Sequence, residues 1–438
     1  MIKITFLGAG STVFSKNVLG DCLLTDSLKN IDIALYDIDP DRLEESYTVI
    51  STINKTYGKG AKIKKYLGVE QRREALRDAD FVINAVQIGG YDPCTITDFE
   101  IPKKYGLRQT IGDTIGIGGI FRGLRTIPVM LDFVHDMEEV CPDAWFLNYT
   151  NPMAILTGAV LLESSIKTVG LCHSVQVCAK SLLDSVGMKD VYDDTVEWTI
   201  AGINHQAWLL SITKNGEGLY PEIKRRVRDG IITDKYNLVR LEIMKVFGYY
   251  VTESSEHLSE YLPYFIKNRN PELIDRFNIP LDEYPRRCVE HIKDWARLKK
   301  ELVDNPNLTH TRSNEYASYI IEAMVTNKPI KIGANVLNTG LITNLPSKAC
   351  VEVPCVVDAS GIVPTYVGDL PEQLAAINRT NINPQLLTIE AALTRKKEKI
   401  YQAALLDPHT SAELTIDEII KLCDDLIEAH GDWLPKYY

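Results

Sequence analysis

A cysteine and a histidine in the middle of the chain have the chemistry of metal ligands. Cys172 follows the apolar run Thr168–Leu171, and His205 ends the segment Gly202-Ile203-Asn204-His205. A thiolate and an imidazole brought together can bind a divalent cation and leave coordination positions open for substrate oxygens. One cysteine and one distant histidine do not form a dedicated motif, so a small buried thiol and a core histidine remain the alternative interpretation.

A second polar segment, Asn148-Tyr149-Thr150-Asn151-Pro152, follows the apolar run Ala144–Leu147. Both apolar runs are typical of buried parallel strands. The carboxyl ends of such strands meet at one edge of the sheet, which is the usual ligand side. We therefore expect Asn148 and Asn151 at the same edge as Cys172, and we predict that Asn148 contacts a cofactor there.

The amino terminus carries a glycine-rich turn. After the run Ile2–Leu7 the chain reads Gly8-Ala9-Gly10-Ser11-Thr12. The two glycines allow a tight turn, and the backbone N–H groups of this segment can approach a pyrophosphate at the start of a helix. Val13 stands where the third glycine of the full dinucleotide-binding fingerprint would be, so a tight turn without a ligand is the alternative.

Two later runs place polar side chains at the same edge of the predicted sheet. Ile31–Tyr36 is followed by Asp37, and Phe81–Val86 supplies Asn84 and Gln87 near its carboxyl end. The carboxylate of Asp37 is expected to accept hydrogen bonds from the adenosine ribose and to repel a 2′-phosphate, which favours NAD over NADP. The order of these elements is that of a βαβ nucleotide-binding unit.

The elements that must position these residues indicate an α/β fold. Apolar runs alternate with amphipathic segments in the first half, which is typical of a parallel sheet with helices on both faces. We predict a Rossmann-like, doubly wound NAD-binding domain over residues 1–195, then a mixed α+β domain for substrate binding and oligomerisation over residues 196–438. The second part has an apolar patch at Cys350–Val357 and ends in a helix before Gly431. The expected apolar stripe of that helix is Ile416, Ile419, Ile420, Cys423, Leu426 and Ile427.

Composition argues against several classes of protein. The chain has 438 residues and a formal net charge of −11, whereas a general nucleic-acid binder needs a basic face to displace counterions. There is no run of roughly 18 apolar residues, and the amino terminus leads into a strand, so neither a membrane span nor a signal peptide is expected. Nine cysteines without regular spacing are typical of free thiols in a reducing compartment, and we predict the cytoplasm.

The motifs together resemble glycoside hydrolase family 4, the NAD- and metal-dependent glycosidases. The resemblance covers nearly the whole chain. Five segments carry it: Gly8–Thr12, Asp113-Thr114-Ile115-Gly116-Ile117-Gly118-Gly119, Asn148–Pro152, Cys172-His173-Ser174-Val175 and Ala201-Gly202-Ile203-Asn204-His205. Within the family, Thr252–His257 and Leu281–Glu290 resemble the melibiose-cleaving α-galactosidases.

The resemblance implies hydrolysis through a transient oxidation, in contrast to the glycosidases that use two carboxylates. A hydride passes from carbon 3 of the sugar to NAD⁺, and the resulting ketone acidifies the proton on carbon 2 while a metal ion stabilises the enolate. A base removes that proton, the aglycone leaves from carbon 1, water adds, and the hydride returns. NAD⁺ is therefore regenerated in each cycle.

The resemblance also assigns the metal and substrate residues. Cys172 and His205 match the metal ligands of the family, usually for manganese. Asn151 matches the asparagine that holds the sugar hydroxyls near carbons 2 and 3, and Asp113 and Arg287 are further expected substrate contacts.

Two residues match the acid and the base of the family. His173 stands where many relatives carry the acid that protonates the leaving oxygen, although phospho-sugar relatives have aspartate there. The base is expected to be a tyrosine of the run Glu260–Phe265, with Tyr261 first and Tyr264 second, and an aromatic packing role is the alternative for Tyr261. A tyrosine has an ordinary pKa of ~10, so it requires a nearby cation for such a role.

Four functions are compatible with these residues. The first is an α-galactosidase for small unphosphorylated α-galactosides, acting as a homodimer or homotetramer. The second is an α-galacturonidase or α-glucosidase, and Arg286 or Arg287 would then hold a carboxylate at carbon 6. A hydroxy-acid dehydrogenase would instead accumulate NADH, and a non-enzymatic NAD sensor would leave the cysteine and histidines without a purpose.

Overall fold

The short apolar runs of the first half form the parallel part of a mixed sheet in the computed structural model, which describes residues 1–28 and 30–438. The strand order β3-β2-β1-β4-β5-β6 is that of doubly wound dinucleotide-binding folds, so the predicted Rossmann-like fold is confirmed. All five predicted runs are strands. The bounds are β1 (Lys3–Leu7), β2 (Asp32–Asp37), β3 (Lys62–Leu67), β4 (Phe81–Asn84), β5 (Trp145–Asn148) and β6 (Lys167–Gly170).

The strand β3 was missed by the sequence reasoning. It forms the edge of the sheet, where Lys62, Lys64 and Lys65 are exposed, and only Ile63 and Tyr66 are partly buried. Lysines on an edge strand prevent pairing with another chain. The same lysines interrupt the sequence of β3, so it lacks the continuous apolar run by which the other strands were predicted.

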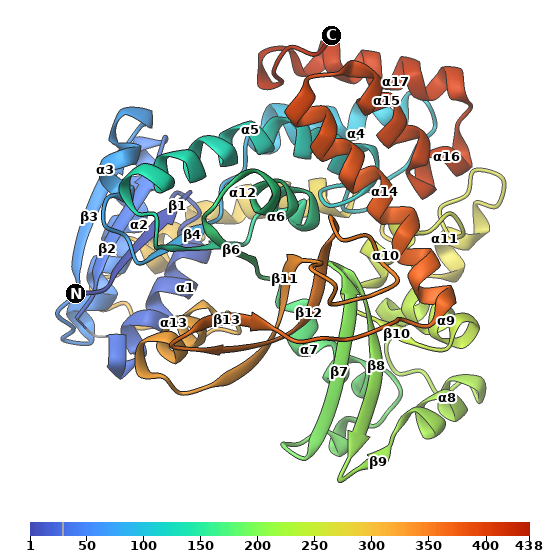
Figure 1. The fold of residues 1–438 in the computed structure, drawn as a ribbon, viewed down its shortest axis with the longest axis horizontal. Coiled ribbons are helices and arrows are strands. Elements are labelled where there is room, and N and C mark those ends of the chain that lie inside the picture. The colour runs from blue at the N-terminus through green and yellow to red at the C-terminus, as the bar shows by residue number, and fades with distance from the viewer. Residues whose placement is uncertain (29) are drawn as a thin grey trace.

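Helices cover both faces of the parallel strands (Figure 1). On one face, α1 (Thr12–Leu24) and α2 (Pro40–Thr56) pack on side chains such as Ile4 and Phe6. On the other face, α5 (Gly116–Val140) and α6 (Met153–Glu163) pack on side chains such as Leu7. The remaining helices of this half are α3 (Arg72–Leu76), α4 (Ile96–Lys103) and α7 (Ser174–Ser185).

The second half continues the same sheet with antiparallel strands. β11 pairs with β6 at Asn335 and Gly170, and the order then runs β11-β12-β7-β8-β10. The predicted mixed domain is confirmed, and its apolar patch is strand β12. The strands are β7 (Val196–Ile203), β8 (Gln206–Lys214), β9 (Glu217–Gly218), β10 (Tyr250–Val251), β11 (Ile330–Leu337), β12 (Cys350–Asp358) and β13 (Gly361–Pro364).

The helices of the second half fall into two groups. One group lies between β9 and β11 in the sequence: α8 (Tyr220–Arg228), α9 (Leu238–Phe247), α10 (Ser255–Tyr261), α11 (Glu272–Arg276), α12 (Glu283–Leu302) and α13 (Ala317–Thr326). The other group ends the chain: α14 (Glu372–Thr394), α15 (Lys397–Leu406), α16 (Pro408–Glu413) and α17 (Ile416–His430). Among the described residues, no helix combines the length and the apolar character that a membrane span requires.

The carboxyl-terminal helices return to the first half of the chain. They lie beside α5 and α6 (Figure 1), and His430 of α17 hydrogen-bonds the buried Asp98 of α4 at 2.9 Å. The two halves therefore pack against each other, and a domain boundary near residue 195 stays a prediction. In α17, Ile419 and Leu426 are buried as expected, but Ile416 is exposed because it is the first residue of the helix.

Candidate functional site

The glycine turn lies at the carboxyl end of the parallel strands. Gly8 has φ +83°, and a side chain there would come within 2.9 Å of the Ala85 backbone, so the turn requires glycine. Ser11 is exposed just before α1, whereas the Thr12 hydroxyl is buried against Ser46 Oγ at 2.9 Å. The first N–H groups of α1 therefore face this edge, where they can bind an anion.

Asp37 lies beside this turn at the end of β2. Its Oδ2 accepts a hydrogen bond from Gly10 N at 2.6 Å, and its Oδ1 accepts from Ile38 N at 2.8 Å. A side chain on Gly10 would come within 2.8 Å of the same carboxylate. The acid and the turn are thus in contact, as a dinucleotide site requires.

The two buried asparagines at the ends of β4 and β5 bond to each other. Asn84 Nδ2 donates to Asn148 Oδ1 at 2.9 Å, and Asn148 Nδ2 donates to Thr157 Oγ1 at 3.0 Å. Both side chains are fully buried, and these bonds fix the two strand ends. Gln87 is exposed at the same edge. Contacts of these three side chains with a cofactor stay predictions.

A thiol, an imidazole and a carboxylate meet at the junction of the two halves. Possible ligand atoms of Cys172, His205 and Glu253 all lie within 4.8 Å of one another. Glu253 Oε2 is 3.9 Å from the sulfur and 3.7 Å from His205 Nε2. Cys172 follows β6, His205 lies in the turn between β7 and β8, and Glu253 follows β10.

The backbone of this cluster is strained. His205 has φ +61° and Glu253 has φ +64°, in the left-handed region that such side chains seldom adopt. Strain of this kind persists at sites where the side chain must point in one direction. The sequence reasoning missed Glu253. The only signal was its place in the segment Thr252–His257, and acidic residues are common.

The protonation states suit a divalent cation. Burial lowers the pKa of His205 to about 4, so the imidazole is neutral. Burial opposes ionisation of Glu253, but at the acidic pH where this carboxyl titrates the protonated His205 and His257 outweigh burial and hold its pKa at about 2. Burial and the Glu253 charge raise the pKa of the Cys172 thiol, so the thiolate needs a bound cation. Sulfur, imidazole and carboxylate together form a donor set for a transition metal.

A second group of side chains adjoins the cluster. His257 Nδ1 is 3.7 Å from Glu253 Oε1, and His257 Nε2 is 3.7 Å from Asp113 Oδ1. The rings of His257 and His205 lie 4.5 Å apart between centroids. Burial lowers the pKa of His257, but Asp113 and Glu253 outweigh it and raise the pKa to about 9. At neutral pH, His257 is therefore a cation between two carboxylates.

Of the two candidate bases, only Tyr261 faces the cluster. It is fully buried, its ring centroid is 6.5 Å from that of His205, and its hydroxyl donates to Asn204 O at 3.4 Å. Burial and the nearby carboxylates raise its pKa well above the usual value. Tyr264 is 52% exposed and packs edge-on against Phe265.

The structure brings together two of the three expected substrate residues. Asn151 Nδ2 donates to Asp113 Oδ2 at 3.3 Å, which links the end of β5 to the loop before α5. The expected acid His173 follows Cys172 and is exposed, with its Nδ1 4.0 Å from Glu315 Oε1. It therefore lies at the solvent side of the cluster.

Arg287 is exposed on α12 and has no hydrogen bond or ion pair with Asn151 or Asp113 among the described residues. Its Nε donates to Glu283 Oε1 at 2.7 Å and its Nη2 to Glu256 Oε1 at 3.3 Å. The neighbouring Arg286 also pairs with Glu283. Carboxylates therefore neutralise the positive charges of both arginines.

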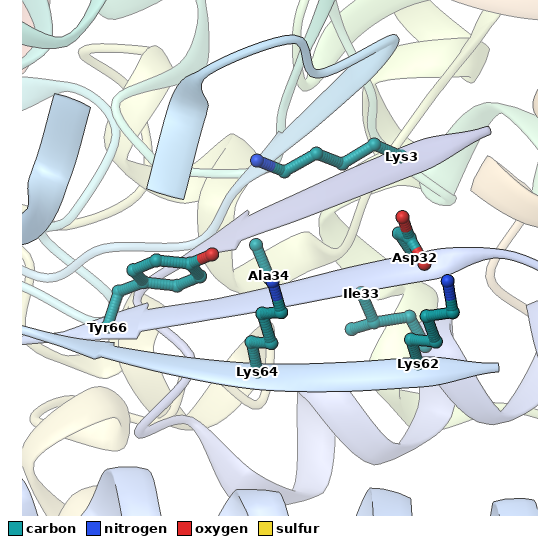
Figure 2. A pocket seen from close by; sticks show the side chains of 7 residues that line it. All are labelled: Lys3, Asp32, Ile33, Ala34, Lys62, Lys64 and Tyr66. Atoms are coloured by element: carbon teal, nitrogen blue, oxygen red, sulfur yellow. The ribbon is translucent and has the colours of Figure 1, made fainter. Parts of the chain in front are cut away.

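A small pocket elsewhere in the sheet has no part in this arrangement. Figure 2 shows Lys3, Asp32 and Lys62 lining it across β1, β2 and β3. Each is the first residue of its strand, so the pocket lies toward the amino ends of the strands. Ligands of doubly wound sheets bind at the opposite ends.

The arrangement can bind a dinucleotide at one end and a metal ion with a polyol at the other. Comparison with known proteins identifies the family and the shared fold. Residues 3–188 match the family model described as "Family 4 glycosyl hydrolase", and residues 200–410 match its C-terminal domain. Among solved structures, a 6-phospho-alpha-glucosidase from gut microorganisms, in complex with NAD and Mn²⁺, has a TM-score of 0.79 at 22% identity. The match covers all of both chains and shows the shared fold.

Relatives of known sequence extend over the whole chain. An alpha-galactosidase of Bacillus subtilis (strain 168) is 63% identical over 437 residues, which is 100% of both chains. An alpha-galactosidase of Rhizobium meliloti (strain 1021) is 35% identical over 99% of this chain and 89% of its own length. With both family models matched and this identity over its full length, the chain belongs to the family 4 glycosyl hydrolases.

Proposed function

We propose that the protein is an NAD- and divalent-metal-dependent α-galactosidase that hydrolyses small α-galactosides. The observation that carries the proposal is the cluster of Cys172, His205 and Glu253, with Tyr261 beside it and a dinucleotide turn in the same sheet. The full-length similarity to relatives named alpha-galactosidase supports the choice of sugar.

The residues present fit both cofactors. Gly8, Gly10, Ser11 and Asp37 would hold NAD⁺, and Cys172, His205 and Glu253 would hold Mn²⁺ or a similar ion. When bound, NAD⁺ accepts and returns a hydride at carbon 3, and the cation stabilises negative charge on the neighbouring sugar oxygens.

The side chains around the cluster then divide the remaining steps. Asn151 and Asp113 orient the sugar hydroxyls near carbons 2 and 3. Tyr261 removes the proton from carbon 2, because it is the tyrosine that faces the cluster. Burial and the nearby carboxylates raise the pKa of this phenol, and a cation held by Cys172, His205 and Glu253 would offset the charge of those carboxylates. His173 donates a proton to the leaving oxygen from the solvent side.

The site favours a neutral sugar over a uronide. Arg286 and Arg287 were the candidates for binding a carboxylate at carbon 6, but Glu283 and Glu256 already balance their charges. A uronide would have to compete with these carboxylates. The dehydrogenase and sensor alternatives lose their support, because the chain belongs to a glycoside hydrolase family.

Location and assembly complete the proposal. We propose a cytoplasmic enzyme, because all nine cysteines are free and seven of them are buried.

We also propose a homodimer or homotetramer. Helix α12 supports this, since none of its twenty residues is fully buried and Ile292 is 57% exposed. Light scattering coupled to gel filtration measures the mass in solution.

Hydrolysis of nitrophenyl glycosides tests the proposed function. The enzyme, supplied with NAD⁺, Mn²⁺ and a thiol reductant, should hydrolyse the α-galactoside faster than the α-glucoside and the α-galacturonide. Hydrolysis should stop after chelation or removal of NAD⁺, and no NADH should accumulate. Full activity without either cofactor would overturn the redox route, and a preference for the uronide would overturn the choice of sugar.

A further inference from the structure

Two buried arginines lie one turn apart on α5, and only one has all its donor nitrogens in use. Arg125 Nε donates to Ile88 O at 3.1 Å, and its two terminal nitrogens donate to the carboxylate of Asp98 at 3.1 and 2.6 Å. Every nitrogen of this guanidinium therefore has a partner. Arg125 joins α5 to α4 and has the contacts of a structural residue.

Arg122 is 7% exposed but is much less satisfied. Its Nε donates to Asn151 O at 3.1 Å, and its Nη1 makes a long bond of 3.4 Å to Tyr284 Oη. Its Nη2 donates to no group among the described residues. A guanidinium carries five N–H groups, so several N–H groups of Arg122 remain free to donate hydrogen bonds to a ligand.

The position of Arg122 indicates what the ligand is. It contacts the backbone of Asn151, whose side chain bonds Asp113, and the Asp113 charge acts on the guanidinium. The carboxylate of Asp113 can accept hydrogen bonds from hydroxyls, and the guanidinium can only donate. A guanidinium next to a carboxylate is nearly neutral as a pair, so it suits a neutral polyol better than a phosphate.

We propose that Arg122 is a substrate-binding residue whose free N–H groups donate to hydroxyl oxygens of the sugar that Asn151 and Asp113 hold. The proposal rests on the proposed function and adds a charged hydrogen-bond donor to the site. The planar fork of arginine can bind two neighbouring oxygens at once, which lysine cannot do.

Binding of galactose to the enzyme loaded with NAD⁺ and Mn²⁺ tests the proposal without catalysis. Arg122→Met should weaken galactose binding about 10- to 100-fold, as expected for lost hydrogen bonds from a charged group. The affinities for NAD⁺ and Mn²⁺ should stay within about threefold of wild type. Arg122→Lys should recover only part of the galactose affinity, because it keeps the charge and loses the fork.

Arg125→Met is the matched control. It should lower the melting temperature more than Arg122→Met, because it leaves Asp98 buried without its cation. Added guanidinium ion should restore turnover to Arg122→Ala in a saturable way, which a structural role would not allow. Unchanged galactose binding in both Arg122→Met and Arg122→Lys would overturn the proposal.

The proposed function can fail separately. If wild-type enzyme hydrolyses no α-galactoside, the proposed function is wrong, and the galactose titration still decides the role of Arg122. If wild-type enzyme hydrolyses the substrate but neither its KM nor its affinity for galactose depends on Arg122, only this inference is wrong.

Discussion

Glu260→Gln should make the folded state less sensitive to high pH, because it removes a buried carboxyl whose ionisation destabilises the fold. Glu260 of α10 is 3% exposed and precedes Tyr261. Its carboxylate accepts from Thr110 N at 2.5 Å and from Gly112 N at 3.1 Å, and so holds the loop that carries Asp113. Burial raises the pKa of this carboxyl to about 7 in spite of these bonds.

The size of the effect follows from this pKa. The ordinary value is 4.5, and each pKa unit corresponds to about 1.4 kcal/mol, so the rise to about 7 amounts to about 3 kcal/mol. The pKa is higher in the folded state, so the proton favours folding. The stabilisation of the folded state by the proton on Glu260 is fully present below pH 4.5 and is lost as the pH rises through 7. Glutamine stays neutral and does not titrate.

Urea unfolding of the metal-free protein at pH 5 and pH 8.5 measures the difference. At pH 5 the variant should be less stable by about 1 kcal/mol, because an amide N–H₂ replaces one acceptor oxygen. At pH 8.5 it should be more stable than wild type by about 2 kcal/mol, because the wild-type loss of about 3 kcal/mol exceeds this cost of about 1 kcal/mol. If the free energies of unfolding of the variant and of wild type changed in parallel with pH, this account of Glu260 would be refuted.

Glu283→Gln provides a control of opposite sign. Burial raises the pKa of Glu283, but Arg287 and Arg286 outweigh it and lower the pKa below its usual value. Its contribution to stability is therefore present above pH 4.5 and is lost as the pH falls through the lower folded-state pKa. This variant should be less stable than wild type at pH 8.5, and the difference between the two proteins should be smaller at low pH.

Three further predictions concern the cluster and the base. Cys172→Ser should lower Mn²⁺ affinity, measured by electron paramagnetic resonance of the free ion, because a hydroxyl is a poorer ligand than a thiolate; unchanged binding would return Cys172 to a packing role. Glu253→Gln should weaken Mn²⁺ binding more than Cd²⁺ binding, because the carboxylate is the hard donor of the set, and equal losses would contradict its role as a ligand. Tyr261→Phe should cut turnover about 10²- to 10⁴-fold while NAD⁺ and Mn²⁺ still bind. In heavy water the wild-type product should carry deuterium at carbon 2, and a nearly normal Tyr261→Phe enzyme would exclude Tyr261 as the base.

Local patterns in the sequence determined the first half of the fold. Continuous apolar runs predicted five parallel strands, because a strand buried on both faces needs no polar positions. The glycine turn and Asp37 were found for the same local reason, since tight geometry at a strand end restricts residue type. The edge strand β3 lacked such a signal, because one neighbour and open solvent leave its residues free to be polar.

Only the tertiary structure decided which distant side chains share the site. Glu253 lies 81 residues from Cys172 in the sequence, and the pairing of β10 with β8 brings it to the sulfur and to His205. Burial likewise separates Tyr261 from Tyr264, which sequence alone leaves as alternatives. The sequence determines local conformation through the backbone, but the contacts between strand ends depend on how the whole sheet is ordered, which no local pattern records.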